Sequence, residues 1–238
     1  MTQDEAVARL IAELDRAERV RSAVQGDPAS APRRAAFRAW QAARLARTHA
    51  DLLASPRFGL AAQFFLTDLY GPQDISVQTA QVRRIVPLMT RTLPASALET
   101  VADAIELDGL SEELDGAMIA ALADKAEALD GASYATAYRT IARESERKRQ
   151  IDLIEHLGRS LDGLTHQPFI GAALKMMRKP AEIAGLGALQ SFLERGYAAF
   201  KVMKGGSDFV AIVAGREREV SRRLYAGDDA VLDIASVG

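Results

Sequence analysis

The chain has 238 residues, 48% of them hydrophobic, and a formal net charge of −2, so it can form one large or two small domains and carries no global field toward nucleic acid. It lacks cysteine, which excludes disulfides, cysteine-ligated zinc, iron–sulfur clusters and thiol catalysis. No apolar run approaches the roughly 18 residues of a membrane span, and residues 1–5 resemble neither a secretory signal nor a transit peptide, so we expect a soluble cytoplasmic protein that does not interact with membranes.

The segments between breaker residues repeat with helical period, and almost none alternates with the period of a strand. This pattern predicts an all-α fold. A first, peripheral helix is expected over residues 4–24, before the break at Gly26-Asp27-Pro28. A second is expected over residues 32–54, and it should end at Ser55-Pro56.

Residues 58–70 are apolar on nearly every side of a helix, which is typical of a helix in the centre of a bundle. Asp68 falls in the last turn, before the Gly71-Pro72 stop, where the helix dipole is unfavourable to an anion. Two interpretations remain open: a small-ligand site around Asp68 and Tyr70, or a structural carboxylate paired with an arginine. The candidate partners from adjacent helices are Arg44, Arg47, Arg83 and Arg84.

Breaker and capping residues also predict the remaining helices. In chain order these cover roughly residues 76–93, 94–108, 111–130, 134–164, 168–180, 186–203 and 207–227. Pro87 should kink the first of them, and Ser133 should cap the long helix over 134–164. The tail after Gly227 is expected to fray.

The segment over residues 186–203 carries a seam of residues separated by alternating steps of three and four, a spacing typical of coiled-coil-type packing. Its members are Leu186, Leu189, Leu193, Gly196, Phe200 and Met203. Gly196 has no side chain, so another helix could approach closely there. We expect the seam to be buried, either inside the chain or across a homodimer.

The three histidines predict no metal of the ferritin-like kind, because none follows a glutamate by three residues. Asp152 and His156 are four residues apart on one predicted helix face, which Arg149 extends. They could hold a ligand or metal, or form a base–orienter pair, although such pairs are also common on solvated helix surfaces. His49 could face a haem or bilin pocket, but its charged neighbours favour a partly exposed, hydrogen-bonded histidine.

Charge is unevenly distributed along the chain. Residues 28–60 carry six arginines against Asp51 alone, and residues 95–132 carry ten acidic residues against Lys125 alone. A nucleic-acid interface on the basic helix is conceivable, but the acidic overall balance and the absence of a recognition motif argue against nucleic acid as a partner. Packing of arginine stems, or pairing with the acidic helices, is the expected explanation.

Four segments together resemble a family of bacterial proteins of unknown function. They read FFLxDLYGPxD over residues 64–74, RIVP over 84–87, GLxxLQxFLExG over 185–196, and Arg216-Glu217 near the end. The resemblance covers most of the chain from about Thr48 onward. It implies an all-helical domain of bacterial origin, and it implies no activity, cofactor or catalytic residues.

These observations predict one all-α domain over residues 1–238, with eight or nine helices around a buried central helix at 58–70. The expected function is that of a small-molecule-binding or protein-interaction module. The alternative is an enzyme with a haem-oxygenase-like or ferritin-like pocket, although no cofactor is indicated. A homodimer could form through residues 186–203. The candidate ligand-binding residues are Arg44, His49, Asp68, Tyr70, Arg84, Asp152 and His156.

Overall fold

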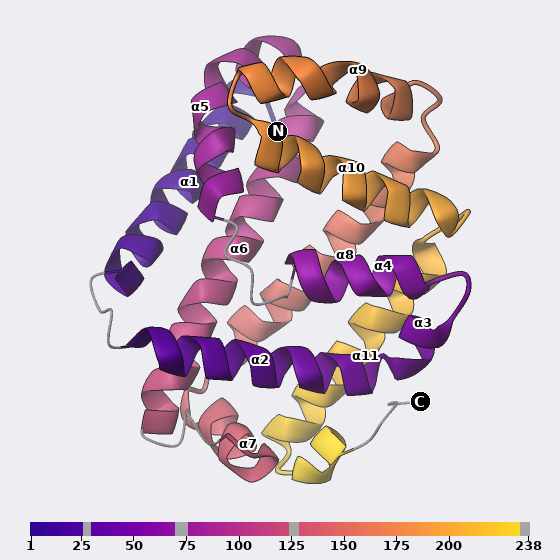
Figure 1. Cartoon of the computed structure of the whole chain (residues 1–238). Coiled ribbons are helices and arrows are strands. Elements are labelled where there is room, and N and C mark those ends of the chain that lie inside the picture. Colours follow the sequence, from indigo (N-terminus) through magenta and orange to yellow (C-terminus); the bar gives the residue numbers. More distant parts are fainter. Residues whose placement is uncertain (26–29, 70–75, 124–128, 234–238) are drawn as a thin grey trace.

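The computed structural model describes residues 1–25, 30–69, 76–123 and 129–233, and within these ranges the chain is helical with no strand. The all-α prediction is confirmed, but the described residues form eleven α-helices rather than eight or nine (Figure 1). They are α1 (Gln3–Gln25), α2 (Ala31–Thr48), α3 (Ala50–Ala54), α4 (Gly59–Phe64), α5 (Ser76–Thr92), α6 (Ala95–Leu122), α7 (Gly131–Thr140), α8 (Glu144–Thr165), α9 (Ile170–Ile183), α10 (Gly187–Val202) and α11 (Ser207–Tyr225), with a π-helix, η2 (Phe65–Leu69), and a 3-10 helix, η4 (Asp229–Asp233).

The longest helix, α6, packs against α1, α2, α7 and α8. It runs through Gly109, where the sequence predicted a helix end and a new start at Ser111. A Cβ at Gly109 would lie 3.6 Å from Cα of Ala17, so the missing side chain lets α1 approach closely. This packing outweighs the helix-propensity cost of glycine, about 1 kcal/mol relative to alanine.

Two predicted helices are each divided in two. The helix expected over 32–54 is interrupted at His49, which separates α2 from α3. The helix expected over 134–164 is interrupted before α8, where Ala142 has a left-handed backbone with φ of 51°. The first of these two helices, α7, is capped by Asp130 rather than Ser133, because the Asp130 carboxylate accepts a hydrogen bond of 2.7 Å from the Ser133 amide.

The segment predicted as a central helix is α4 followed by the π-helix η2. Phe64 and Phe65 are buried, but Leu60 is 60% exposed and Gln63 is also exposed. The expectation of burial on all sides was therefore wrong: one face packs against α10 and the opposite face meets solvent.

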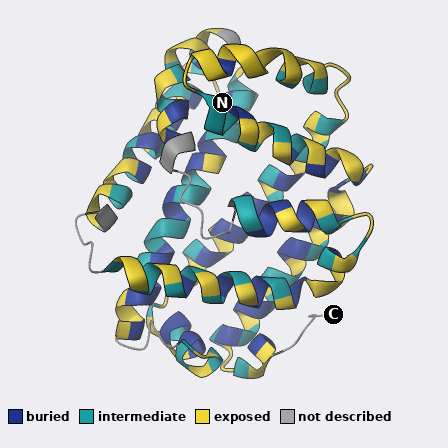
Figure 2. Ribbon diagram, viewed as in Figure 1, coloured by how far each residue is buried: buried dark blue, intermediate teal, exposed yellow. Residues whose placement is uncertain are grey.

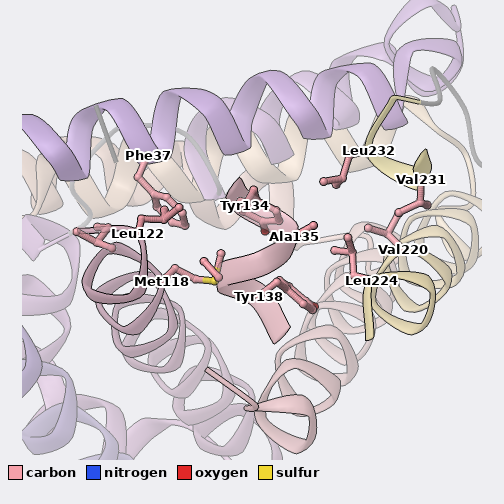
Figure 3. Packing of buried hydrophobic residues seen from close by; sticks show 12 residues of the cluster. Phe37, Met118, Leu122, Tyr134, Ala135, Tyr138, Val220, Leu224, Val231 and Leu232 are labelled. Carbon is pink, nitrogen blue, oxygen red and sulfur yellow. The ribbon is translucent and has the colours of Figure 1, made fainter. Parts of the chain in front are cut away.

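One buried cluster joins α2, α6, α7, α11 and η4 (Figure 3). In it, Phe37 of α2 and Tyr134 of α7 stack with ring centroids 6.2 Å apart. Val231 and Leu232 of η4 are buried in the same cluster. Residues 229–233 are therefore helical and packed on the core, although they follow Gly227, after which the sequence predicted a frayed tail; residues 234–238 lie outside the described ranges.

The basic and acidic helices pair with each other, as the charge distribution predicted. Arg34 and Arg38 of α2 both bind the carboxylate of Glu112 on α6. Arg16 of α1 binds Glu113 on α6 at 2.8 Å. In the part of the chain that the structure describes, no helix combines the length and apolar character needed to cross a membrane.

Candidate functional site

A buried ion cluster joins α2, α11 and the break between α2 and α3. Nη1 of Arg44 donates to both carboxylate oxygens of Glu217, each at 2.7 Å. Nε2 of His49 lies 3.2 Å from Oε1 of the same carboxylate. Arg44 and His49 are buried, and the Glu217 side chain is only 13% exposed. His49 is thus a core residue, contrary to the expectation of partial exposure.

The Arg44–Glu217 pair is held in its charged form. Burial alone would raise the pKa of Glu217, but the Arg44 guanidinium and the His49 ring outweigh that effect and hold the pKa at about 2. Burial opposes the charge on Arg44, yet Glu217 raises the pKa of Arg44 above its ordinary value. Removing either charge leaves the other in a dry environment, so the pair acts as one unit.

The residue before Glu217 fixes the backbone at the same break. Arg216 donates to the carbonyl of Thr48 at 3.2 Å and binds the Asp51 carboxylate at 2.6 and 2.8 Å. The hydrogen bond from Arg216 lowers the pKa of Asp51. Adjacent residues of α11 therefore hold both the side chain of His49 and the chain on either side of it.

The second face of His49 borders a small apolar void. It is lined by His49, Leu52, Ala62, Phe65, Leu66, Phe209 and Val213. Its volume is about 10 Å³, close to the minimum for one water molecule. Among the described residues, Nδ1 of His49 has no hydrogen-bond partner. Among the described residues, the void beside this nitrogen has no room for a haem, bilin or other organic ligand.

A second buried polar group lies along the same face of α2. Nε2 of Gln41 donates to Asp115 of α6 at 3.3 Å, and burial raises the pKa of Asp115 although Arg147 opposes that shift. Arg147 of α8 donates to Gln150 at 3.1 Å and lies 5.0 Å from the ring centroid of Tyr138. These groups connect α2, α6, α7 and α8, and we therefore interpret them as a structural network.

Asp68 pairs with an arginine that the sequence did not single out. Its Oδ1 accepts from Nε and Nη2 of Arg195 on α10, at 2.9 and 2.5 Å, and its Oδ2 accepts from Thr67 at 2.9 Å. None of the four predicted arginines is its partner; Arg84 instead donates to the carbonyl of Ala184 at 2.9 Å. Tyr70, the other residue of the predicted ligand site, lies outside the described residues.

Asp152 and His156 lie on the same helix, α8, but belong to different ion networks. Asp152 binds Lys148 and Arg218, each at 2.8 Å. Nε2 of His156 lies 3.2 Å from Asp103 of α6. Each side chain therefore has its own partner. Among the described residues no group of three or more His, Cys, Asp and Glu side chains is placed to hold a metal ion.

Sequence reasoning did not select Glu217 or Arg195 as site residues, although Glu217 lies in a segment that carries the family resemblance. A signal for Glu217 was present, because Val213, Glu217, Val220 and Leu224 follow steps of four and three on one helix face. A carboxylate within such a line predicts a buried charge that needs a partner. Arg195 gave no such signal: it is half exposed, and its partner is 127 residues away.

The largest exposed apolar side chains gather on α9 and on Phe169, the residue that directly precedes this helix; most of the surface of α9 is exposed (Figure 2). Phe169 is 80% exposed, Met176 77% and Ile183 89%. With the exposed Ala173 and Pro180, they form a line with steps of four and three residues, which we call the α9 stripe. Met177, 52% exposed, borders it.

The opposite face of α9 is fixed to α10. A Cβ at Gly171 would lie 2.8 Å from the Tyr197 hydroxyl, so the two helices are in close contact. Gln190 donates to the carbonyl of Leu174 at 2.6 Å, and Arg178 binds Glu194 at 2.6 Å. The stripe is therefore held outward by an anchored helix.

One further hollow lies on the surface between α6 and α7, with a volume of about 280 Å³. Its lining residues are Ala121, Leu122, Ala132, Ser133, Thr136, Ala137 and Thr140. They offer methyl and hydroxyl groups and no charged side chain.

A family model described as a domain of unknown function (DUF8198) matches residues 20–231. Since this covers most of the chain, the protein belongs to that family. No curated protein and no solved structure matches the chain.

Proposed function

We propose that this member of a family of unknown function is a protein-interaction module, and that the α9 stripe is its docking surface. The observation that carries the proposal is the exposure of Phe169, Met176 and Ile183 on one line of an anchored helix. Large apolar side chains that are contiguous on a surface are typical of interaction sites. Met176 and Met177 add flexible side chains that adapt to a partner.

The cavities give less support to the small-molecule and enzyme alternatives. The void beside His49 has about 10 Å³, whereas drug-sized ligands occupy pockets of roughly 300–1,000 Å³. The hollow between α6 and α7 is closer to that size, but the described residues that line it include no titratable side chain. An interaction surface requires neither a pocket nor a reactive group.

Crosslinking in the cells of origin tests the proposal. A photoreactive amino acid at position 177, beside the stripe, should give one discrete crosslinked species, and the same group at the exposed position 60 of α4 should not. Adding Ile183→Glu should remove the species without changing the melting temperature, because Ile183 makes little contact with the rest of the chain. If position 177 gives no species, or if the species survives Ile183→Glu, the α9 stripe is not a docking surface.

A further inference from the structure

We infer that the partner of the α9 stripe is a second copy of this chain, paired with α9 antiparallel to itself about a two-fold axis at Met176. This inference rests on the proposed function. It concerns α9 rather than the segment 186–203, because Gly196, Phe200 and Met203 of that segment are buried within the chain. α10 therefore supports the interface from behind.

The spacing of the three large side chains of the stripe is self-complementary. Phe169 precedes Met176 by seven residues, and Ile183 follows it by seven. An antiparallel two-fold pairing therefore sets Met176 against Met176 of the second copy and Phe169 against Ile183 of the second copy. A two-fold interface requires a surface that complements itself in this way. Pro180 then faces the small Ala172 of the second copy, where the helices can approach closely.

The charges of α9 permit the same pairing. Lys175, Arg178 and Glu182 lie on the side of the helix away from the stripe. Only Lys179 borders the stripe, and about the Met176 axis it faces Ala173 of the second copy. No like charges of α9 meet, and the lysine stem can cover apolar surface.

The size of the stripe predicts a weak dimer. It spans 14 residue steps, about 21 Å of helix. One pair of helices of this length falls at the low end of interface sizes, below about 1,200 Å² of total buried area, where association is reversible. Dimer formation should therefore depend on protein concentration.

Sedimentation equilibrium of the full chain is the first test. The average mass should rise from 25.7 kDa toward twice that value as the concentration increases from about 1 to about 200 µM. Met176→Glu should weaken the dimer at least tenfold, whereas Leu60→Glu, which alters a similarly exposed apolar residue on α4, should not. A wild-type chain that stays monomeric, or a dimer unaffected by Met176→Glu, would overturn the inference.

The absence of cysteine allows a test of the register. Met176→Cys should form a disulfide-linked dimer on mild oxidation, because a disulfide needs Cα atoms within about 7 Å. Phe169→Cys alone should not, but an equal mixture of Phe169→Cys and Ile183→Cys should link the two variants. Self-linking of Phe169→Cys as well as Met176→Cys would indicate a parallel pair, and self-linking of Phe169→Cys alone would move the axis to position 169; either result would contradict an antiparallel pair centred on Met176.

The crosslinked mass from position 177 separates this inference from the proposed function. Twice the chain mass supports both. A different mass, together with a monomeric purified chain, leaves the docking surface in place and shows that its partner is not a second copy.

Discussion

Nη1 of Arg44 on α2 lies 2.7 Å from each carboxylate oxygen of Glu217 on α11, in a region where Arg44 is 8% exposed. This contact joins residues 173 positions apart and ties the first half of the chain to its last long helix. It also positions His49, which shares the carboxylate. Two buried polar side chains, Arg44 and His49, therefore depend on one carboxylate.

Replacing that carboxylate should be costly. Glu217→Gln leaves the Arg44 charge buried without an opposite charge, and we expect it to lower the free energy of unfolding by about 3–5 kcal/mol. The double variant Arg44→Met with Glu217→Leu removes both charges and should regain most of this loss. Urea denaturation of the three proteins measures the effect.

An exposed ion pair on the same helix provides the control. Glu219 binds Arg222 at 2.6 Å, and Arg222 is 67% exposed. Glu219→Gln should therefore leave the free energy of unfolding nearly unchanged, because solvent screens the exposed pair. If Glu217→Gln is equally mild, the buried cluster does not stabilise the fold.

Acid should weaken the stabilisation that Glu217 gives to the fold. The pKa of Glu217 is about 2 in the folded chain, below its ordinary value of 4.5. A lowered carboxyl pKa stabilises the fold above pH 4.5, and that stabilisation is lost as the pH falls from 4.5 toward 2. The difference in free energy of unfolding between wild type and Glu217→Gln should shrink by about 2 kcal/mol between about pH 6 and about pH 3.

Urea titrations at several pH values check this. Comparing wild type with Glu217→Gln cancels the acid response of the other carboxylates. A constant difference across the range would mean that the pKa of Glu217 is not lowered.

Local patterns identified the helical class and the long first helix, because apolar periodicity and breaker residues act within a few turns. They failed where distant packing decides the backbone. The helix continues through Gly109 because α1 packs there, and it breaks at His49 where Arg216 binds the Thr48 carbonyl. Neither outcome is encoded in the neighbouring residues alone.

The polar sites show the same limit. The need of Asp68 for a cation follows from its place at a helix end, but the choice of Arg195 depends on how α10 crosses η2. Arg44 was a candidate site residue. It is buried, and its partner Glu217 was not among the candidates. The sequence therefore predicts which charged groups need a partner, but it does not predict which residue that partner is.

Gly196 tests the packing of α10. A Cβ there would lie 2.9 Å from Cζ of Phe64 on α4, so a phenylalanine ring fills the space that the seam predicted for a close helix. The expectation that the whole seam is buried was wrong, because Leu193 is 42% exposed. Gly196→Leu should cost about 1–3 kcal/mol through overpacking. Thermal melts measure it, and Phe64→Ala in the same chain should reduce the added cost.

A second glycine controls for helix propensity. Gly215 of α11 has no atom within 4 Å of the position a Cβ would take. Gly215→Ala should raise the free energy of unfolding by up to about 1 kcal/mol. Gly196→Ala should raise the free energy of unfolding by less, because the new methyl group contacts Phe64. Equal gains at the two positions would show that α4 yields to α10 without strain.

Asp68→Asn distinguishes a structural carboxylate from a ligand-facing one. The Asp68 side chain is 10% exposed, but its partner Arg195 is 50% exposed, so solvent screens the pair and can accept Arg195 once the charge is removed. We therefore expect Asp68→Asn to lower the free energy of unfolding by about 1 kcal/mol, less than Glu217→Gln. Arg195→Met should lower the free energy of unfolding by about the same amount, and the double variant by little more, because both substitutions remove the same interaction.

Stability that is unchanged or raised by Asp68→Asn would instead favour a ligand-facing carboxylate, since binding sites retain groups that lower the stability of the fold. Urea denaturation of the four proteins decides between the two interpretations.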